Sequence, residues 1–292
     1  VLEAMTKLIV GLFLAWYLLR LGFGSEFSAA GAIAGVTASG LVSLVYLMIR
    51  FRRKNSAQGL AKTDDRPESA KHILKVLASI AIPITLSSSV VPITTYLDTV
   101  QVQNLLQSAL GYSEELAVSL YGCYQKAITI YNLPSAFMVS LTACIVPAVS
   151  AALTKKDQIG AGKIAESALR VGALLALPAG VGLAVLSGPI IQMLYPETNQ
   201  EIASHCLMVL GIASAFVCMM LLCNAILQAN GRAALPIWFI AIGSATKLIV
   251  NFILVQMPSV GIKGAPVGTL VCFMLVSVME LIAIKRVTPH PP

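Results

Sequence analysis

Long apolar runs separated by short polar segments dominate the hydropathy pattern of this chain. A helix needs about 20 mostly apolar residues to cross the hydrocarbon core of a membrane. The pattern predicts spanning helices at 5–23, 29–50, 76–102, 116–153, 165–194, 202–227, 235–255 and 264–284. We expect the two long runs, 116–153 and 165–194, to tilt or to end in interfacial turns. The sequence therefore predicts an all-α polytopic membrane protein with about eight transmembrane helices.

Composition strengthens this prediction and removes one class of partner. The chain is 57% hydrophobic and 11% charged, with a mean hydropathy of +0.84, whereas a soluble domain averages about 25% charged residues. The net charge of +7 would suit a nucleic-acid binder if it covered one face. The basic residues instead lie mainly between apolar runs, where they set membrane topology. We therefore expect no nucleic-acid partner.

The basic residues are concentrated in alternate segments between the predicted helices. Fifteen of the 20 Lys and Arg residues lie in the hydrophilic segment 50–75, near the loops after the fourth and sixth predicted helices, or at the C-terminal end. The other loops hold Arg20 and Lys263 with the acidic stretches 108–116 and 195–201. Because cytoplasmic loops are enriched in Lys and Arg, we predict a multi-pass cell-membrane protein whose linker and C-terminus are cytoplasmic.

A short repeat relates the first two predicted helices to the last two. Thr6-Lys7-Leu8-Ile9-Val10 recurs as Thr246-Lys247-Leu248-Ile249-Val250, and Gly31-Ala32-Ile33-Ala34-Gly35 matches Gly264-Ala265-Pro266-Val267-Gly268. Each helix pair ends in basic residues and runs in the same direction. The pattern is typical of a parallel internal repeat, as found in transporters.

The repeat predicts how the chain is organised. We expect the last two helices of an N-terminal lobe at 1–51, a cytoplasmic linker at 52–72, a six-helix C-terminal lobe at 73–286 and a cytoplasmic tail at 287–292. If the two lobes are alike, the first four helices of the N-terminal lobe, roughly 150 residues, precede this sequence.

Several apolar motifs occur in a recognisable order along the predicted third and fourth helices. They are Ile82-Pro83-Ile84-Thr85-Leu86, Tyr96-Leu97-Asp98-Thr99, Tyr131-Asn132-Leu133-Pro134-Ser135 and Ile145-Val146-Pro147-Ala148-Val149-Ser150. With two lobes and a basic linker, the chain resembles the multidrug/oligosaccharidyl-lipid/polysaccharide (MOP) exporter superfamily. Within it, the chain looks like the polysaccharide-flippase branch, close to the stage V sporulation protein B group and similar to lipid II flippases.

The resemblance implies a function and a set of partners. It implies export of an undecaprenyl-pyrophosphate-linked saccharide, a cell-wall, spore-cortex or polysaccharide precursor, by alternating access. The partners expected are this lipid-linked saccharide and membrane lipids. A coupling cation, sodium or proton, is a further candidate partner, and we expect no cofactor.

Ionisable residues inside the spans are candidates for substrate binding, because a charge at the bilayer centre costs about 2.5–3.5 kcal/mol on insertion scales. Lys126 is the first candidate for an anionic headgroup, since the resemblance implies a cavity cation on this helix near its Leu-Pro-Ser motif. The alternative is that Lys126 snorkels to the interface. Asp98 could pair with Lys126, bind a coupling cation, or lie at the outer interface.

The remaining candidates are neutral polar residues and the two lysines of the repeat. Gln101, Gln125 and Asn132 could bond sugar hydroxyls or hold helices together. Lys7 and Lys247 could bind substrate or snorkel. The predicted substrate-binding set is therefore Lys126, Asp98, Gln101, Gln125, Asn132, Lys7 and Lys247, with no catalytic residue and no metal ligand.

Other function classes find less support. The three histidines have no ligand spacing, the six cysteines form no CxxC pair, and no HExxH, GxxxxGK[ST] or GxSxG motif occurs. We therefore expect no enzyme. The alternatives are a cation-coupled multidrug exporter on the same scaffold, which would need acidic cavity residues, a membrane-embedded glycosyltransferase, and a scaffold protein without transport activity.

Overall fold

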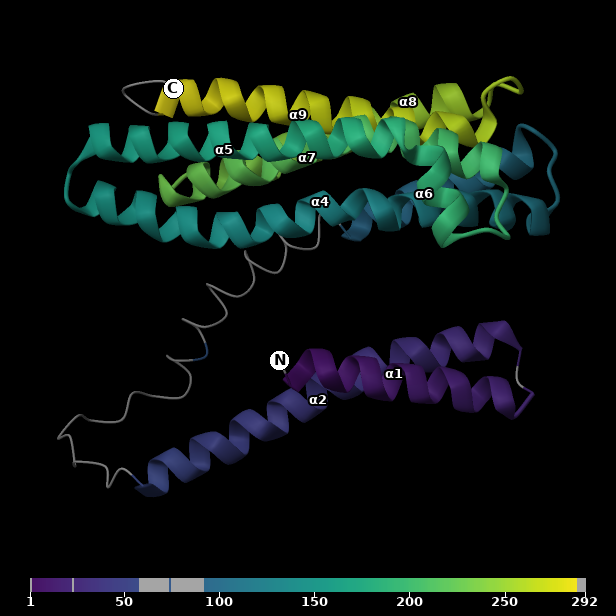
Figure 1. Cartoon of the computed structure of the whole chain (residues 1–292), viewed down its shortest axis with the longest axis horizontal. Helices are drawn as coiled ribbons and strands as arrows, with labels where there is room; N and C mark the ends of the chain where they lie inside the picture. Colours follow the sequence, from purple (N-terminus) through teal and green to yellow (C-terminus); the bar gives the residue numbers. More distant parts are fainter. Residues whose placement is uncertain (1, 23, 58–73, 75–91, 288–292) are drawn as a thin grey trace. The chain divides into compact units, whose positions relative to one another are not determined.

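The computed structural model describes residues 2–22, 24–57, 74 and 92–287, and the secondary structure of these residues is helical (Figure 1). By its internal contacts the chain divides into two units, Val1–Ile73 and Leu74–Pro292. Each unit is described by itself.

The first unit is a helical hairpin of α1 (Leu2–Arg20) and α2 (Ser25–Ala57). A Cβ atom added at Gly35 would lie 2.4 Å from the Cα atom of Gly11, so two glycines set the close approach of the helices. Helix α2 runs seven residues beyond its predicted end at 50, into the segment expected to be linker. The Arg and Lys residues there are good helix formers, so the helix continues after the apolar run stops.

The second unit holds a helical segment at 92–108 and seven further helical elements. These are α4 (Glu114–Thr154), α5 (Gln158–Val185), α6 (Ser187–Leu194), α7 (Gln200–Ala229), α8 (Ala234–Val255), the 3-10 turn η1 (Gly261–Gly264) and α9 (Ala265–Val287). The first part of the third expected helix, and most of the linker and the tail, lie outside the described residues.

The expected helix at 165–194 is two helices. It begins earlier, where the Asp157 side chain accepts a hydrogen bond from the Gly160 backbone N–H, and it breaks at Leu186 before α6 begins. Pro189 explains the position of the break. A proline has no N–H to donate and is tolerated in the first turn of a helix rather than in its interior.

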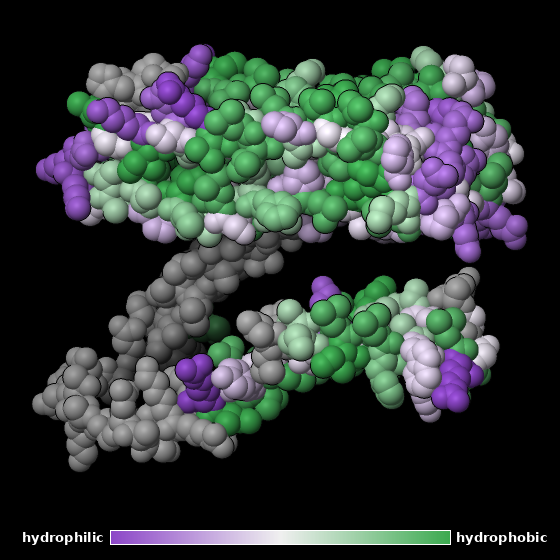
Figure 2. Space-filling model, viewed as in Figure 1, coloured by the Kyte–Doolittle hydropathy of each residue, from purple (hydrophilic) through white to green (hydrophobic). Residues whose placement is uncertain are grey.

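Six helices among the described residues are long and apolar enough to cross a membrane. They are Phe27–Arg50, Glu114–Thr154, Gln158–Val185, Gln200–Ala229, Ala234–Val255 and Gly261–Arg286. The other two predicted spans correspond to α1 and to the run described only from residue 92. On the visible face of the second unit, hydrophobic residues fill the middle and hydrophilic residues gather at both ends, as expected for a membrane-spanning bundle (Figure 2).

Helix α7 is the central helix of the second unit and packs against α4, α5 and α9 (Figure 1). A Cβ atom added at Gly180 of α5 would lie 2.8 Å from the Gly211 carbonyl oxygen of α7. Small residues allow such close packing of helices in a membrane. The buried side chains of α7 therefore form much of the core, among them Leu207, Leu210 and Leu222.

The hairpin of α8 and α9 repeats the packing of α1 and α2. In the sequence repeat, Gly11 corresponds to Asn251 and Gly35 corresponds to Gly268. A Cβ atom added at Gly268 would lie 2.0 Å from Asn251 Oδ1, which is the same pairing that brings Gly35 against Gly11. The repeated sequence is thus also a repeated helix crossing.

Candidate functional site

A buried ion pair joins the helical segment 92–108 to α8. Lys247 Nζ donates to Asp98 Oδ2 at 2.8 Å, and Asn251 Nδ2 donates to Asp98 Oδ1 at 2.5 Å. Asp98 is 2% exposed and Asn251 is fully buried. The four-residue spacing of Lys247 and Asn251 places both on one face of α8, so one helix supplies both partners of the carboxylate.

A chain of hydrogen bonds extends from the same segment to α4. Gln125 Nε2 donates to the Tyr121 hydroxyl at 2.7 Å, and that hydroxyl lies 2.8 Å from Thr99 Oγ1. Thr99 Oγ1 also lies 2.9 Å from the Thr95 carbonyl oxygen, to which it donates. Thr99 therefore accepts from Tyr121, and the chain runs in one direction from α4 to the segment 92–108.

A cavity of about 220 Å³ opens beside the ion pair. Its lining comes from the segment 92–108, α4, α7, α8 and α9: Thr94, Thr95, Tyr131, Asn132, Val217, Met220, Ile240, Ser244, Lys247, Cys272, Phe273 and Val276. Lys247 is the charged residue of this set. An ammonium group carries three donors, and Asp98 uses one of them. The cavity can therefore offer a cation, an amide and hydroxyl groups to a polar anion.

Five of the seven residues predicted for substrate binding belong to this region. Asp98 and Lys247 form the pair, and Asn132 lines the cavity. Gln101 and Gln125 lie in the surrounding hydrogen-bond network, where the Gln101 amide donates to the Leu248 carbonyl oxygen at 2.8 Å. Gln101 thus connects the segment 92–108 to α8 directly, whereas Gln125 bonds Tyr121 on its own helix and reaches that segment only through the Tyr121 hydroxyl.

Lys126 lies elsewhere in the second unit, and the Asp98–Lys126 pair considered from the sequence is not formed. Its ammonium group donates to Thr198 Oγ1 and lies 5.5 Å from the centroid of the Tyr195 ring, in the turn between α6 and α7. Helical phase explains the difference. Tyr121 and Gln125, four residues apart, face the segment 92–108, whereas the next residue points about 100° further round the helix.

Lys7 belongs to the first unit, where it is an exposed residue of α1. Its counterpart in the repeat, Lys247, is the residue that forms the buried pair. The identity of five residues in the repeat therefore does not give the two lysines the same surroundings.

Sequence reasoning missed Asn251, Tyr121 and Ser244. Neutral polar residues inside an apolar helix give a weak signal, because most of them bond their own helix. For Asn251 a signal was available. It lies four residues after Lys247, and the first copy of the repeat has a glycine at the corresponding position.

A polar, cation-bearing cavity within a bundle of apolar helices is typical of membrane transporters, and two solved transporter structures share this fold. The inward-facing form of a multidrug resistance MATE transporter of the MOP superfamily matches with a TM-score of 0.71 and 16% identity, over 98% of this chain and 64% of that one. Lipid II flippase MurJ, in an inward closed conformation, matches with a TM-score of 0.66 and 18% identity, over 97% of this chain and 54% of that one.

The chain belongs to the family described as lipid II flippase MurJ, whose model matches residues 6–291. It is 28% identical to the uncharacterized membrane protein YabM of Bacillus subtilis (strain 168) over 97% of this chain and 52% of the relative. It is 26% identical to stage V sporulation protein B of the same strain over 92% of this chain and 51% of the relative. The chain thus spans about half the length of these relatives.

Family membership confirms the superfamily that the sequence motifs indicated. The family is one of flippases and not of enzymes, which counts against the glycosyltransferase alternative.

Proposed function

We propose that this chain acts in a flippase that exports an undecaprenyl-pyrophosphate-linked saccharide, a cell-wall, spore-cortex or polysaccharide precursor, across the cytoplasmic membrane by alternating access. One observation, added to family membership, carries the proposal: the charged residue lining the 220 Å³ cavity is a lysine. A pyrophosphate is an anion, and an ammonium group is a compact donor to phosphate oxygens. We assign Lys247 to that contact.

The buried ion pair suits a site that alternates between empty and loaded states. An unpaired ion in apolar surroundings is costly, and Asp98 neutralises Lys247 while the cavity is empty. A phosphate entering the cavity competes with Asp98 for the ammonium group. Asn251 continues to donate to Asp98 during that exchange, so the carboxylate keeps one partner.

The remaining polar groups of the cavity fit the saccharide. Asn132 and Ser244 line the cavity beside Lys247, and their amide and hydroxyl groups match sugar hydroxyls. Phe273 and Tyr131 supply apolar faces against which a sugar ring can pack. The chemistry offered is therefore that of a phosphorylated, hydroxyl-rich headgroup.

The membrane potential is the proposed driving force. Moving a net negative charge out of an inside-negative cell is favoured by about 2.3 kcal/mol per charge per 100 mV. A coupling cation, sodium or proton, remains a proposed partner. Such a cation would compete with Lys247 for Asp98, because both oxygens of that carboxylate already accept hydrogen bonds.

For Lys126 we propose a structural role and not a contact with the headgroup. Its contacts with Thr198 and Tyr195 support a role in holding the turn between α6 and α7. The structure thus favours Lys247 over Lys126 as the residue that meets the headgroup.

The test is binding of a short-chain prenyl-pyrophosphate saccharide to the purified protein, combined with complementation of a flippase-deficient strain. We expect Lys247→Gln to weaken binding at least tenfold and to abolish complementation. Removing one partner of a buried ion pair costs about 3–5 kcal/mol, so Lys247→Gln alone could fail to fold. The double variant Asp98→Asn/Lys247→Gln removes both charges and should fold while failing to bind.

Two further lysine variants make the result specific. Lys263→Gln removes a half-buried lysine that is paired with Glu201 away from the cavity, and this variant should bind normally. Lys126→Gln should reduce binding less than twofold. If the folded double variant binds as tightly as the wild type, Lys247 is not the headgroup contact. If Lys126→Gln alone removes binding, the site lies at the α6–α7 turn.

A multidrug exporter is the alternative with the same fold. Cationic drugs prefer acidic or aromatic cavities, and the carboxylate in this region is already paired with Lys247. Displacement of the prenyl-pyrophosphate saccharide by an equimolar hydrophobic cation would favour that alternative.

A further inference from the structure

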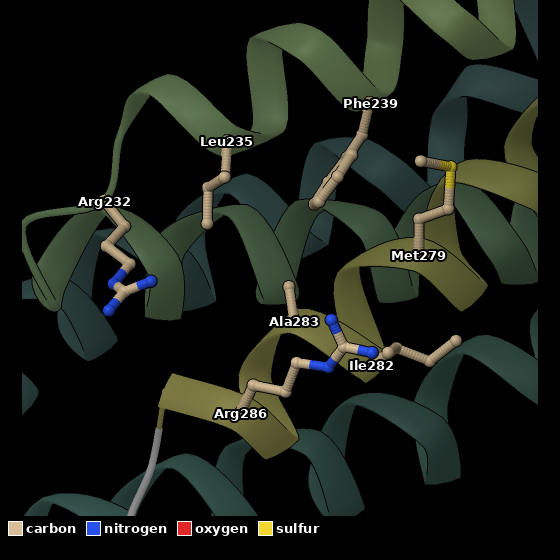
Figure 3. Close-up of a pocket in the computed structure, with 7 residues that line it drawn as sticks. All are labelled: Arg232, Leu235, Phe239, Met279, Ile282, Ala283 and Arg286. Atoms are coloured by element: carbon tan, nitrogen blue, oxygen red, sulfur yellow. The ribbon is translucent and has the colours of Figure 1, made fainter.

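A second cavity, of about 320 Å³, lies between α8 and α9. Arg232 lines it from the turn before α8, Leu235 and Phe239 line it from α8, and Met279, Ile282, Ala283 and Arg286 line it from α9. Figure 3 shows Arg232 at one end, Phe239 and Met279 toward the other, and the Arg286 side chain extending from α9 toward Ala283 and Ile282. The spacing of the α9 residues is that of one helical face, so the cavity follows the hairpin lengthwise.

The two guanidinium groups have no ion-pair or hydrogen-bond partner among the described residues. In contrast, Arg170 pairs with Glu166, and Lys263 pairs with Glu201. Arg232 and Arg286 are exposed, so water satisfies them in the absence of a ligand. Two unpaired guanidinium groups at one cavity form a site for an oxyanion.

The rest of the cavity wall is apolar and carries no hydroxyl or amide side chain. From Arg286 to Met279 is seven residues, which is about 10 Å along the helix. The cavity therefore offers two cations, with Arg232 at one end, and a hydrocarbon surface about 10 Å long. That combination matches a lipid phosphate followed by the first part of an acyl chain.

The position along the bundle agrees with such a ligand. Arg232 and Arg286 lie at the end of the second unit that also carries Lys155, Lys156 and Lys285, whereas Glu114, Glu197 and Glu201 lie at the other end. Leu235 and Ile282 continue from the arginines into the hydrophobic middle of the bundle, which Figure 2 shows. Basic pockets between helices at this level of a membrane bind anionic headgroups.

We propose that the α8–α9 cavity is a binding site for an anionic glycerophospholipid, whose phosphodiester contacts Arg232 and Arg286. We assign it to a resident lipid of the bilayer rather than to the transported molecule, because the wall has no polar group for a saccharide. The proposal does not depend on the role of Lys247 in the other cavity. Because α8 carries residues of both sites, the lipid would fix the helix that presents Lys247.

Trp238 provides the measurement. It lies 69% exposed on α8, beside Phe239, and Trp16 is the other tryptophan of the chain. In a Trp16→Phe background, quenching of Trp238 by phospholipids with brominated acyl chains gives the relative affinity of phosphatidylglycerol against phosphatidylcholine. We expect phosphatidylglycerol to bind at least tenfold more strongly.

Two variants test the two halves of the site. Arg232→Gln/Arg286→Gln should reduce the tenfold preference to less than twofold. Ile282→Phe fills the cavity and keeps both arginines, without adding a second tryptophan to the fluorescence signal. This variant should lower the affinity for phosphatidylglycerol severalfold. Ile282 is 47% exposed, so the larger side chain should not prevent folding.

Matched controls decide between a built site and a diffuse basic surface. Lys155→Gln/Lys285→Gln removes the same charge from the same end outside the cavity, and Val278→Phe places a phenylalanine on α9 outside the cavity, at a residue 46% exposed. Both control variants should keep the preference for phosphatidylglycerol over phosphatidylcholine. Equal loss in the lysine control would overturn the proposal, and so would displacement of phosphatidylglycerol by an equimolar prenyl-pyrophosphate saccharide.

Discussion

At the residue scale, two fully buried polar side chains in the second unit have opposite surroundings. The Asn251 amide nitrogen donates to Asp98 and only its amide oxygen lacks a partner, whereas both carboxyl oxygens of Glu280 on α9 lack a hydrogen-bond partner among the described residues. A buried polar atom without a partner costs about 1–3 kcal/mol. Asn251 therefore stabilises the bundle, and Glu280 destabilises it.

The two residues should respond to substitution with opposite signs. Glu280→Met, which removes the unpaired oxygens and keeps most of the volume, should raise the free energy of unfolding by about 1–3 kcal/mol. Asn251→Ala should lower it by a similar amount, because Asp98 Oδ1 loses its donor. Thermal denaturation in detergent measures both. A loss of stability in Glu280→Met equal to that in Asn251→Ala would mean that the carboxyl group has a partner after all.

At the scale of elements, the hairpin is the repeated unit of packing. The α1–α2 pair crosses at Gly11 and Gly35, and the α8–α9 pair crosses at the corresponding Asn251 and Gly268. At the crossing, α8 has the polar side chain of Asn251 where α1 has Gly11, which has no side chain. The same backbone arrangement can thus support either close packing or a buried polar contact.

Two glycines of α2 should separate packing from helix propensity. A Cβ atom at Gly35 would meet the Gly11 backbone at 2.4 Å, whereas one at Gly40 would meet nothing within 4 Å. Gly35→Ala should destabilise the protein by about 1–3 kcal/mol through overpacking. Gly40→Ala should stabilise it by up to about 1 kcal/mol, because alanine is the better helix former. The comparison requires only the melting temperatures of the two variants, and equal shifts would contradict the crossing.

At the scale of the whole molecule, the charge distribution of the second unit defines its orientation in the membrane. Basic residues gather at the end that holds the α4–α5 turn, the start of α8 and the end of α9, and acidic residues gather at the opposite end. The excess of Lys and Arg on cytoplasmic loops predicts that the basic end faces the cytoplasm.

Cysteine labelling in intact cells tests this orientation. In a cysteine-free background, an impermeant maleimide should modify Glu197→Cys and leave Lys155→Cys unmodified until the cells are opened. Ser56→Cys, at the end of α2, should behave as Lys155→Cys does. Labelling of Lys155→Cys in intact cells would reverse the predicted topology of the second unit.

The sequence by itself determined the helices and their order. Predicted and observed bounds of α4, α7, α8 and α9 agree within three residues, because a run of 20 apolar residues depends on composition along the chain and not on what packs against it. The repeat could also be recognised from the sequence, because it is a match between residues along the chain. The extension of α2 and the break before Pro189 were missed, since hydropathy measures where a membrane span ends and not where a helix does.

Only the tertiary structure decided which polar groups meet. Asp98 lies 149 residues from Lys247 along the chain, and nothing in a one-dimensional pattern selects that partner over Lys126. The choice depends on helical phase, where one residue is a turn of about 100°, and on which helices are neighbours. An unpaired charge is costly in apolar surroundings. The packing that places Asp98 against α8 therefore pairs it with Lys247, which is also the charged residue that lines the cavity.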